Sequence, residues 1–341
     1  MMESPLRVVQ YGLGPIGQAT ARAVLDRQAG DQMALVGAVD VDSRKVGRDV
    51  ADVLDEVRSP TGVVVSDQAA TVLHEQRPDV VLHATTSTLP SVEEQLRTCA
   101  AAGAHVVSST EELAYPYELH PERAAVLDRL AREAGVVIVG TGVNPGYAMD
   151  TLPLTATGVC TSVDTIRVER VVDAAERRGP LQKKIGAGLS PSDFEAKTET
   201  GGFGHVGLRE SVQMIARGLS WSLSDVQETV APVRAERAVE TPYCSVEVGE
   251  IAGLQHTATG LVDGQERIAL DLRMYLGADP AYDAVQVEGT PPMDVRADGG
   301  IFGDTATVGM LVNTAMLLDD VSPGLKTMLD LPVPRGLGSV V

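Results

Sequence analysis

The chain has 341 residues, of which 44% are hydrophobic and 22% charged, so it is long enough for two ordinary domains and too apolar to be intrinsically disordered. It carries 28 Lys and Arg against 47 Asp and Glu, a formal net charge of −19. An acidic chain of this kind repels phosphate backbones and anionic lipids, which argues against nucleic-acid and membrane partners.

The cysteines and histidines point to no covalent or metal framework. The three cysteines lie far apart, at Cys99, Cys160 and Cys244, and the six histidines are scattered, so neither disulfides nor a metal site is predicted. No apolar run reaches the roughly 20 residues of a membrane helix, and the first residues lack a signal-peptide apolar region. We therefore expect a cytoplasmic protein.

The first half of the chain alternates short β-rich runs with helical stretches. We expect strands at 6–11, 34–40, 62–66, 79–84, 105–108 and 136–139, and helices at about 16–27, 91–102 and 122–134. This alternation predicts βαβ units and a parallel sheet. Ligands bind such sheets at the carboxyl ends of the strands.

The pattern changes near Asn144. The later candidate strands are longer and alternate between polar and apolar residues, at 162–173, 243–252, 255–262, 267–275 and 284–288, with helical pieces at about 191–197 and 206–218. They predict a second, α+β domain with a mixed or antiparallel sheet. Asp304 has the features of an N-cap for a last apolar helix that packs back on the first domain. We expect domains at 1–145 and 146–302 and a C-terminal segment at 303–341.

A glycine-rich turn joins the first expected strand to the first expected helix. It has the G-x-G-x-x-G pattern, in which the glycines permit a tight turn, a close backbone approach to a pyrophosphate and close helix–strand packing. An acid ends the second strand roughly 20 residues further on and suits the ribose hydroxyls of an adenosine. The predicted cofactor contacts here are Gly12, Gly14, Pro15, Ile16, Gly17 and Asp40.

The choice between NAD and NADP stays open. Asp40 favours NAD, because its carboxylate repels a 2′-phosphate. Ser43, Arg44 and Lys45 follow at once and could hold that phosphate through charge-assisted hydrogen bonds. The alternative for Arg44 and Lys45 is that they are solvated charges at the start of a helix.

Polar segments follow three of the expected parallel strands. Thr85, Thr86 and Ser87 follow one strand and Asn144 lies after another, so we expect all four near the nicotinamide. Between them come Glu111 and Glu112. Burying acids at a strand end costs free energy unless they have a function. An apolar cleft raises the pKa of a carboxylate, which suits general acid–base catalysis near neutral pH. The alternative is an acid pair that complements a helix dipole.

Five residues are candidates for the substrate pocket. Asn144 and Tyr147 lie in the segment between the domains, where we expect them to line the pocket. His205, between two glycines near a helix start, lines the pocket or is a structural histidine. Arg170, on an expected strand, anchors a substrate carboxylate or pairs with Glu169 or Asp173. The same two alternatives apply to Arg167.

These segments resemble the 2,4-diaminopentanoate dehydrogenases and the related native amine dehydrogenases. The likeness rests on Tyr11-Gly-Leu-Gly-Pro-Ile-Gly, Ser109-Thr-Glu-Glu-Leu-Ala-Tyr-Pro and Gly140-Thr-Gly-Val-Asn-Pro-Gly-Tyr-Ala-Met-Asp, and continues through Arg177-Arg-Gly-Pro-Leu-Gln-Lys-Lys-Ile-Gly-Ala-Gly-Leu and Gly303-Asp-Thr-Ala-Thr. It therefore spans nearly the whole chain. A true dihydrodipicolinate reductase would carry a His-rich catalytic segment and a Lys…Ser-Gly-Thr-Ala loop, and both are missing from the sequence.

The resemblance implies an N-terminal Rossmann domain with a parallel sheet joined to a dihydrodipicolinate-reductase-like α+β domain with a mixed sheet, in a homodimer. It also implies NAD(P)-dependent oxidative deamination of a small amine or diamino acid, and the reverse reductive amination of a ketone or aldehyde with ammonia. The family's catalytic glutamate falls at Glu111, with Glu112 as the second choice. The alternatives are a carbonyl or imine reductase that does not use ammonia, and a nucleotide-sensing protein without chemistry.

Overall fold

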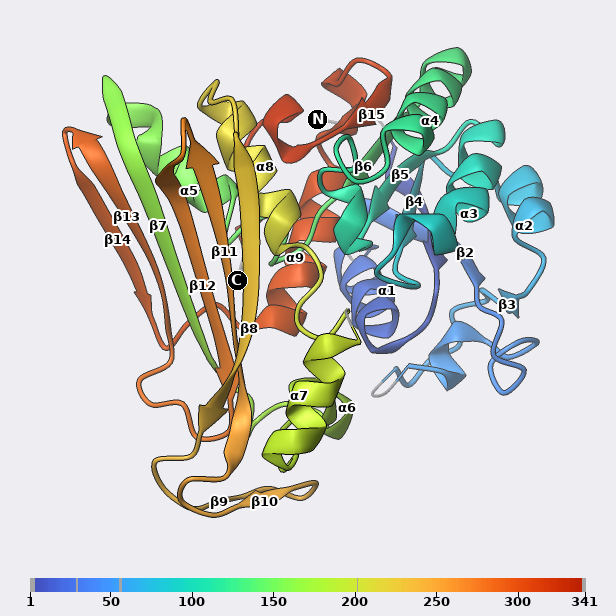
Figure 1. The fold of residues 1–341 in the computed structure, drawn as a ribbon. Coiled ribbons are helices and arrows are strands. Elements are labelled where there is room, and N and C mark those ends of the chain that lie inside the picture. Colours follow the sequence, from blue (N-terminus) through green and yellow to red (C-terminus); the bar gives the residue numbers. More distant parts are fainter. Residues whose placement is uncertain (1–3, 29, 55–56, 201, 339–341) are drawn as a thin grey trace. The chain divides into compact units, whose positions relative to one another are not determined.

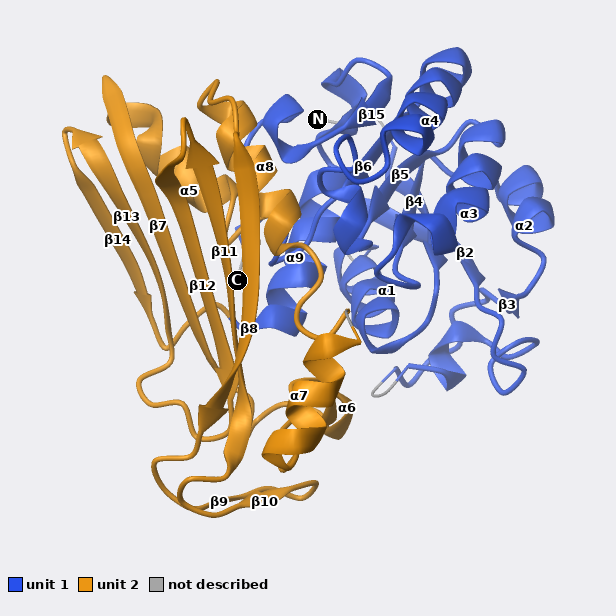
Figure 2. Ribbon diagram, in the orientation of Figure 1, with its two compact units in different colours: residues 1–146, 302–341 blue, residues 147–301 orange. Residues whose placement is uncertain are grey.

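A computed structural model of the chain describes residues 4–28, 30–54, 57–200 and 202–338 (Figure 1). The fold divides into two compact units (Figure 2). The first unit comprises residues 1–146 and 302–341, and the second comprises residues 147–301. Residues 1–3 and 339–341, which fall in the expected first and last segments, lie outside the described residues.

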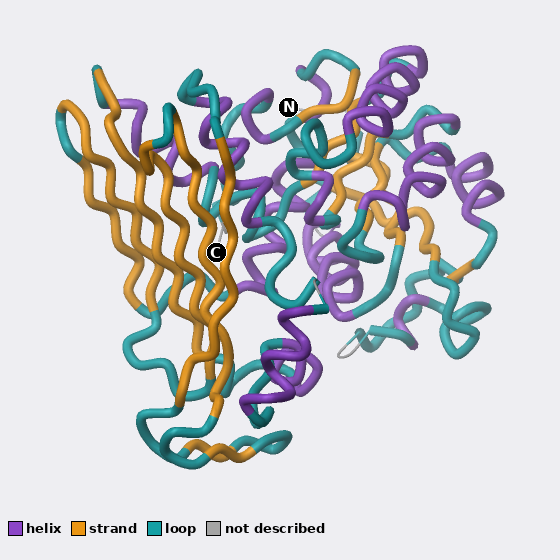
Figure 3. Tube along the Cα trace, in the orientation of Figure 1, coloured by secondary structure: helices purple, strands orange, loops and turns teal. Residues whose placement is uncertain are grey.

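The first unit alternates strands with helices (Figure 3). Its strands are β1 Leu6–Tyr11, β2 Met33–Val39, β3 Val65–Ser66, β4 Val80–His83, β5 His105–Ser108, β6 Val137–Gly140 and β15 Gly324–Lys326. Its helices are α1 Pro15–Gln28, α2 Ala69–Gln76, α3 Leu89–Ala101, α4 Pro121–Ala134 and α9 Gly303–Ala315, and its short 3-10 turns are η1 Val50–Asp52, η2 Glu111–Leu113, η4 Leu318–Asp320 and η5 Met328–Asp330. The expected strands and helices of the first half are present, with ends shifted by at most a few residues.

The strands of the first unit form one parallel sheet in the order β15-β6-β5-β4-β1-β2-β3. The chain moves from β1 to β2 on one side and to β4 on the other, so the strand order reverses between β1 and β4. Ligands of open α/β sheets bind outside the carboxyl ends of the strands at such a switch point. The predicted Rossmann-type fold is confirmed.

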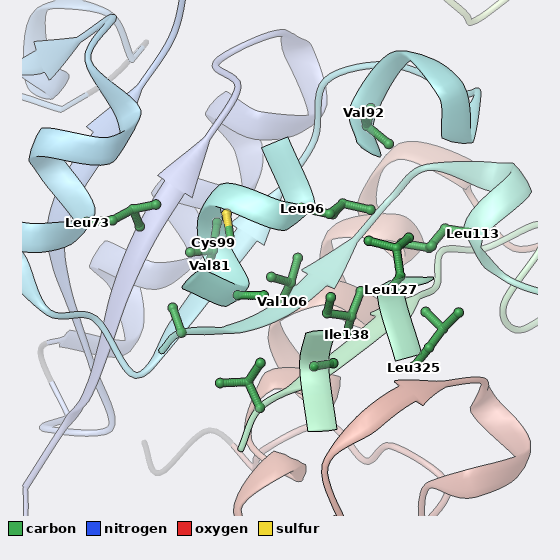
Figure 4. Close-up of a cluster of buried hydrophobic side chains, with 14 of the residues drawn as sticks. Leu73, Val81, Val92, Leu96, Cys99, Val106, Leu113, Leu127, Ile138 and Leu325 are labelled. Atoms are coloured by element: carbon green, nitrogen blue, oxygen red, sulfur yellow. The ribbon is translucent and has the colours of Figure 1, made fainter. Parts of the chain in front are cut away.

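The core of the first unit lies between the sheet and its helices (Figure 4). Val106 of β5 and Ile138 of β6 are fully buried, as are Leu96 of α3 and Leu127 of α4. The same cluster contains Leu113, the last residue of η2. Burying a leucine side chain is worth about 2 kcal/mol, so this side chain anchors the short η2 turn that carries the two candidate acids.

The C-terminal segment belongs to the first unit. Its helix α9 packs beside α1, where the Arg27 guanidinium donates to Asn313 Oδ1. The predicted N-cap role of Asp304 is wrong: Phe302 holds that position and Asp304 lies in the first turn, where a negative charge still complements the helix dipole. Among the described residues, no helix is long and apolar enough to cross a membrane.

The second unit is a mixed sheet with helices. Its strands are β7 Ser162–Asp173, β8 Asp225–Arg234, β9 Val239–Glu240, β10 Ser245–Val246, β11 Ile251–Val262, β12 Gln265–Tyr275, β13 Tyr282–Thr290 and β14 Met293–Asp298, and its helices are α5 Thr151–Ala156, α6 Gly179–Lys184, α7 Pro191–Glu199 and α8 Leu208–Gly218, with η3 Thr157–Val159. The large sheet has the order β14-β13-β7-β12-β11-β8, in which β7 and β12 are parallel and the other pairs antiparallel. The predicted mixed sheet is confirmed.

Some expected elements of the second unit are wrong. The expected strand 243–252 does not exist as one element: residues 245–246 pair with β9, and β11 begins at Ile251 and continues through the expected strand 255–262. Strands β8 and β14 were not expected. Both are edge strands with mostly exposed or half-buried residues, so their sequences lack the apolar signal of a buried strand. Helix α2 of the first unit was missed for a similar reason, since Leu73 is its buried residue.

Candidate functional site

The glycine turn after β1 has the sterics that a nucleotide-binding turn needs. Gly12 has φ +87°, and a Cβ there would lie 2.3 Å from the carbonyl oxygen of Ala84. A Cβ on Gly17 would lie 1.9 Å from the carbonyl oxygen of Gly12, so α1 and the turn can approach each other only without a side chain. Pro15 is the first residue of α1, where its missing N–H costs nothing, and Ile16 follows.

The open side of this turn fits a dinucleotide phosphate. A Cβ on Gly14 would meet no atom within 4 Å, so the backbone there faces open space next to the start of α1. The first turn of α1 contains no acidic residue. A helix whose first turn lacks acidic residues attracts anions there through its free N–H groups and its dipole.

Asp40 follows β2 and connects it to the glycine turn. Its Oδ2 accepts hydrogen bonds from the amide of Leu13 at 2.7 Å and from Nζ of Lys45 at 3.0 Å, and its Oδ1 accepts from the amide of Asp42 at 2.8 Å. Burial raises the pKa of Asp40, but these hydrogen bonds together hold that pKa below its usual value. Asp40 is therefore a fixed carboxylate beside the turn.

The residues after Asp40 differ in exposure. Ser43 is exposed, and the Arg44 side chain is 87% exposed. The Arg44 guanidinium donates to both carboxylate oxygens of Asp42, at 3.0 and 2.7 Å. The Lys45 side chain is only 19% exposed, and its Nζ also donates to the carbonyl oxygen of Leu13 at 2.9 Å. Of the two basic residues, Lys45 is thus held against the glycine turn.

The ends of β4 and β5 are joined by hydrogen bonds. Thr85 and Thr86 are exposed and Ser87 is half-buried, in the loop between β4 and α3. The hydroxyl of Thr110, just after β5, donates to the carbonyl oxygen of Thr86 at 2.9 Å. The amide of Glu112 donates to the carbonyl oxygen of Ser87 at 3.2 Å. The predicted cofactor loop and the predicted acids therefore lie side by side.

The contacts of Glu112 give this acid a structural role. Glu112 Oε2 accepts from the amide of Leu89 at 2.8 Å, at the start of α3, and from His120 Nε2 at 2.8 Å. This carboxylate therefore caps a helix and holds the loop before α4, which is the structural role considered for the acid pair. Glu111, at the start of η2, is half-buried.

The end of β6 supports η2 from another side. A Cβ on Gly140 would lie 2.4 Å from the backbone carbon of Leu113, so this strand end and η2 are in backbone contact. The amide of Thr141 donates to the carbonyl oxygen of Ser108 at 2.8 Å. Asn144 is buried in the following loop, and the amide of its neighbour Val143 donates to Thr307 Oγ1 of α9 at 3.3 Å.

Tyr147 and His205 belong to the second unit. Tyr147 is half-buried just before α5, and its carbonyl oxygen accepts from the amide of Leu152 at 2.8 Å. The amide of His205 donates to Nδ1 of His256 at 3.1 Å, and His256 is buried on β11 next to Glu228. Arg170 pairs with Asp283 at 2.6 Å, so the expected partners Glu169 and Asp173 are wrong.

Sequence reasoning missed a buried polar chain behind the strand ends. His83, the last residue of β4, is fully buried, with Nδ1 2.8 Å from Ser108 Oγ and Nε2 2.7 Å from Gln95 Oε1. The signal that could have found it is an imidazole inside the apolar run Asp79-Val-Val-Leu-His-Ala. A polar side chain in a doubly covered strand requires hydrogen-bond partners, and the polar residues nearest at hand are those of the strand ends.

The fold and the glycine turn define a dinucleotide-dependent dehydrogenase. Residues 147–341 match the family model described as the 2,4-diaminopentanoate dehydrogenase C-terminal domain. The chain is 31% identical over 338 residues to 2,4-diaminopentanoate dehydrogenase of Acetoanaerobium sticklandii, which covers 97% of this chain and 95% of that protein. It is 27% identical over 362 residues to an amine dehydrogenase of Streptomyces virginiae, with 98% of each chain covered.

A solved structure agrees with these sequence relationships. The amine dehydrogenase from Mycobacterium smegmatis superimposes with a TM-score of 0.84 at 25% identity and covers 98% of both chains. The chain belongs to the 2,4-diaminopentanoate dehydrogenase family. The resemblance found in the sequence is confirmed.

Proposed function

We propose that Glu111 is the acid–base residue of an enzyme that deaminates a small amine or diamino acid and, in reverse, aminates a ketone or aldehyde with ammonia. The protein is an NAD(P)-dependent oxidoreductase that acts on amines, as its family membership implies. One observation carries the assignment of the acid: Glu112 Oε2 already accepts from Leu89 and His120, so its carboxylate has a structural task. Glu111, the other acid of the segment that resembles the family's catalytic segment, is therefore the proposed acid–base residue.

The coenzyme-binding residues are proposed from the fit described above. Gly12, Gly14 and Gly17, with Pro15 and Ile16 at the start of α1, would hold the pyrophosphate. Asp40 would accept the ribose hydroxyls of the adenosine. Thr85, Thr86, Ser87 and Asn144 would border the nicotinamide end. When bound, the coenzyme accepts a hydride during deamination and donates one during amination.

The proposed acid–base residue transfers protons in both deamination and amination. In deamination, the Glu111 carboxylate removes a proton from the substrate ammonium and passes it to solvent, which leaves Glu111 ionised and gives the neutral amine whose carbon can lose a hydride. The resulting iminium is positively charged, and a carboxylate nearby stabilises it electrostatically. Glu111 then takes a proton from the water that attacks the iminium carbon, and returns a proton to the nitrogen as ammonia leaves.

We propose NAD as the preferred coenzyme. Asp40 is a fixed carboxylate beside the glycine turn, and Lys45 is bound to it at 3.0 Å. Arg44, the other candidate for a 2′-phosphate, is paired with Asp42. A 2′-phosphate would therefore be repelled by the Asp40 carboxylate, while Lys45 and Arg44 are each paired with a carboxylate.

For the substrate pocket we propose Asn144, Tyr147 and His205, as the sequence predicted. Their side chains are hydrogen-bonding groups, which suits a small polar amine. The relative from A. sticklandii is named for 2,4-diaminopentanoate, and we propose an amine of that size and polarity for this protein. We also propose a cytoplasmic homodimer, with Cys99, Cys160 and Cys244 as free thiols.

The decisive experiment follows NAD(P)H oxidation with a panel of ketones and aldehydes, with and without ammonium. We expect turnover that depends on ammonium, and turnover that ignores ammonium would make the protein a carbonyl reductase. The panel's best substrate is then used with Glu111→Gln, which we expect to lower kcat by about 100-fold or more while the Kd of the coenzyme is unchanged. Glu112→Gln is the matched control, with kcat close to wild type. If Glu112→Gln lost the activity instead, the two roles would be exchanged.

A further inference from the structure

His83 is the centre of a buried hydrogen-bond chain that connects α3, β4 and β5. Gln95 Oε1 is an acceptor, so Nε2 of His83 carries the proton and donates to it at 2.7 Å. Nδ1 of His83 lies 2.8 Å from Ser108 Oγ. The hydroxyl of Thr85 also donates to Gln95 Oε1, at 3.0 Å.

The chain continues to the residue that precedes Glu111. Ser108 Oγ accepts from the amide of Thr110 at 3.1 Å, and the Ser108 hydroxyl donates to Thr110 Oγ1 at 3.0 Å. Ser108 and Thr110 are 0% and 1% exposed, so water does not replace these bonds. Thr110 Oγ1 donates onward to the carbonyl oxygen of Thr86. The sequence of contacts runs from α3 through two strand ends to the loop after β4.

We propose that His83, Ser108 and Thr110 form a positioning clamp that holds Glu111 in register with the 85–87 loop. Thr110 is the N-cap residue of η2, so fixing its amide and hydroxyl fixes the start of the turn in which Glu111 is the first residue. On the other side of Glu111, the amide and carboxylate of Glu112 are bonded to Ser87 and Leu89. The inference rests on the proposed role of Glu111.

The clamp is electrically neutral. Burial lowers the pKa of His83 to about 4, and a hydrogen bond with Gln95 offsets this only in part. The imidazole is therefore uncharged at neutral pH, and Ser108 and Thr110 carry no charge. Such a clamp can orient a neighbouring carboxylate without a strong Coulomb interaction that would bias its proton affinity. A charged clamp, such as an arginine, would bind the same backbone but hold Glu111 ionised.

Hydrogen bonds that merely satisfy buried groups would also appear at these strand ends, so the experiment must separate positioning from stability. Thr110→Val keeps the shape of the side chain and removes its hydroxyl. Thr110→Ser restores a hydroxyl on a smaller side chain. The control is Thr314→Val in α9, a fully buried threonine of the same unit whose hydroxyl has no hydrogen-bond partner among the described residues. Ser108→Ala tests the middle residue of the same hydrogen-bond chain, and it replaces Thr110→Val if that variant does not fold.

All variants are assayed at a temperature where circular dichroism shows them folded, with the best amine or ketone of the substrate panel. We expect Thr110→Val to lower kcat about 10-fold or more, with coenzyme Kd within about twofold, because orientation rather than binding is lost. Thr110→Ser should recover most of kcat, and Thr314→Val should equal wild type. Wild-type kcat in Thr110→Val, failure of Thr110→Ser to recover, or an equal loss in Thr314→Val would overturn the clamp.

A double-mutant cycle with Glu111→Gln tests whether the clamp acts through that residue. We expect Thr110→Val to cost less than about twofold when Glu111 is already Gln, since there is no acid left to position. The same 10-fold cost in both backgrounds would refute the clamp and leave the acid assignment standing. Full activity in Glu111→Gln alone would refute the acid assignment, which is thereby tested separately.

Discussion

Two groups of buried polar side chains, one in each unit, differ in charge. At the ends of β4 and β5 in the first unit, the buried groups are neutral: His83, Ser108 and Thr110. In the second unit, the guanidinium of Arg170 and the carboxylate of Asp283 are 4% and 3% exposed and pair at 2.6 Å. The difference teaches that the second unit buries charge where it joins two strands, whereas the ends of β4 and β5 next to the proposed acid bury neutral polar groups.

The charged pair of the second unit has a structural arrangement. Arg170 is on β7 and Asp283 on β13, and the two residues lie opposite each other in the antiparallel ladder. Arg170 also donates to the carbonyl oxygen of Ile301 at 2.7 Å, and Asp283 Oδ2 accepts from the amide of Ile301 at 2.7 Å. The pair therefore fastens the last residue of the second unit to the sheet.

The largest expected effect comes from breaking this pair. Arg170→Met leaves the carboxylate of Asp283 buried without its counter-ion, which should cost about 3–5 kcal/mol of unfolding free energy. Arg167→Met on the same strand is the matched control. Its side chain is 57% exposed and pairs with Glu266 at 3.3 Å on the surface. We therefore expect Arg167→Met to lower the free energy of unfolding by less than about 0.5 kcal/mol. Urea unfolding followed by circular dichroism measures both.

The double variant Arg170→Met/Asp283→Leu sharpens this test. It removes both charges together, so most of the lost stability should return. If the double variant were as unstable as Arg170→Met, the hydrogen bonds to Ile301 would carry the stability rather than the charge balance. Equal losses in Arg170→Met and Arg167→Met would remove the contrast between buried and surface charge.

The neutral cluster of the first unit predicts that the free energy of unfolding depends on pH, because burial keeps His83 uncharged. Burial lowers the folded-state pKa of His83 from 6.5 to about 4, so the unfolded chain binds a proton at this residue more readily than the folded one. Stability is then fully present above pH 6.5 and is lost as the pH falls from 6.5 towards 4. Between pH 7 and pH 5 this one residue should cost about 2 kcal/mol.

Urea unfolding of wild type and His83→Gln at pH 7 and pH 5 isolates that contribution. The many carboxylates titrate in both proteins, so they cancel in the difference. We expect the wild type to lose more stability than the variant on acidification, whatever the stability of the variant at pH 7. Parallel losses would mean that His83 is protonated in the folded protein, and the neutral clamp would then be wrong.

The sequence predicted the parts of the site that depend on local spacing. The glycine turn, the acid after β2 and the polar ends of β4 and β5 each follow from a short motif between a strand and a helix, and the fold brings them to one edge of the sheet. The structural role of Glu112 could not be predicted, because the Leu89 amide that donates to its carboxylate is 23 residues away in the chain. The same holds for His83, whose partners Gln95 and Ser108 come from other elements.

The smallest expected effect concerns the coenzyme and compares the two basic residues after β2. Arg44 is paired with Asp42 at the surface, so Arg44→Ala should leave the ratio of kcat/KM for NAD and NADP within about twofold of wild type.

Asp40→Ala should lower the preference for NAD about 10-fold, because it removes a charged acceptor for the ribose and releases Lys45 to bind a 2′-phosphate. Adding Lys45→Ala to Asp40→Ala separates these two causes, since only the improved binding of the 2′-phosphate, relative to NAD, needs the lysine. Asp40 also holds the Leu13 amide of the glycine turn, so kcat/KM should fall for both coenzymes in Asp40→Ala, and the ratio, not either value, is the measurement. A changed ratio in Arg44→Ala would instead assign the phosphate to the exposed arginine, and the fixed carboxylate beside the turn would not decide the choice of coenzyme.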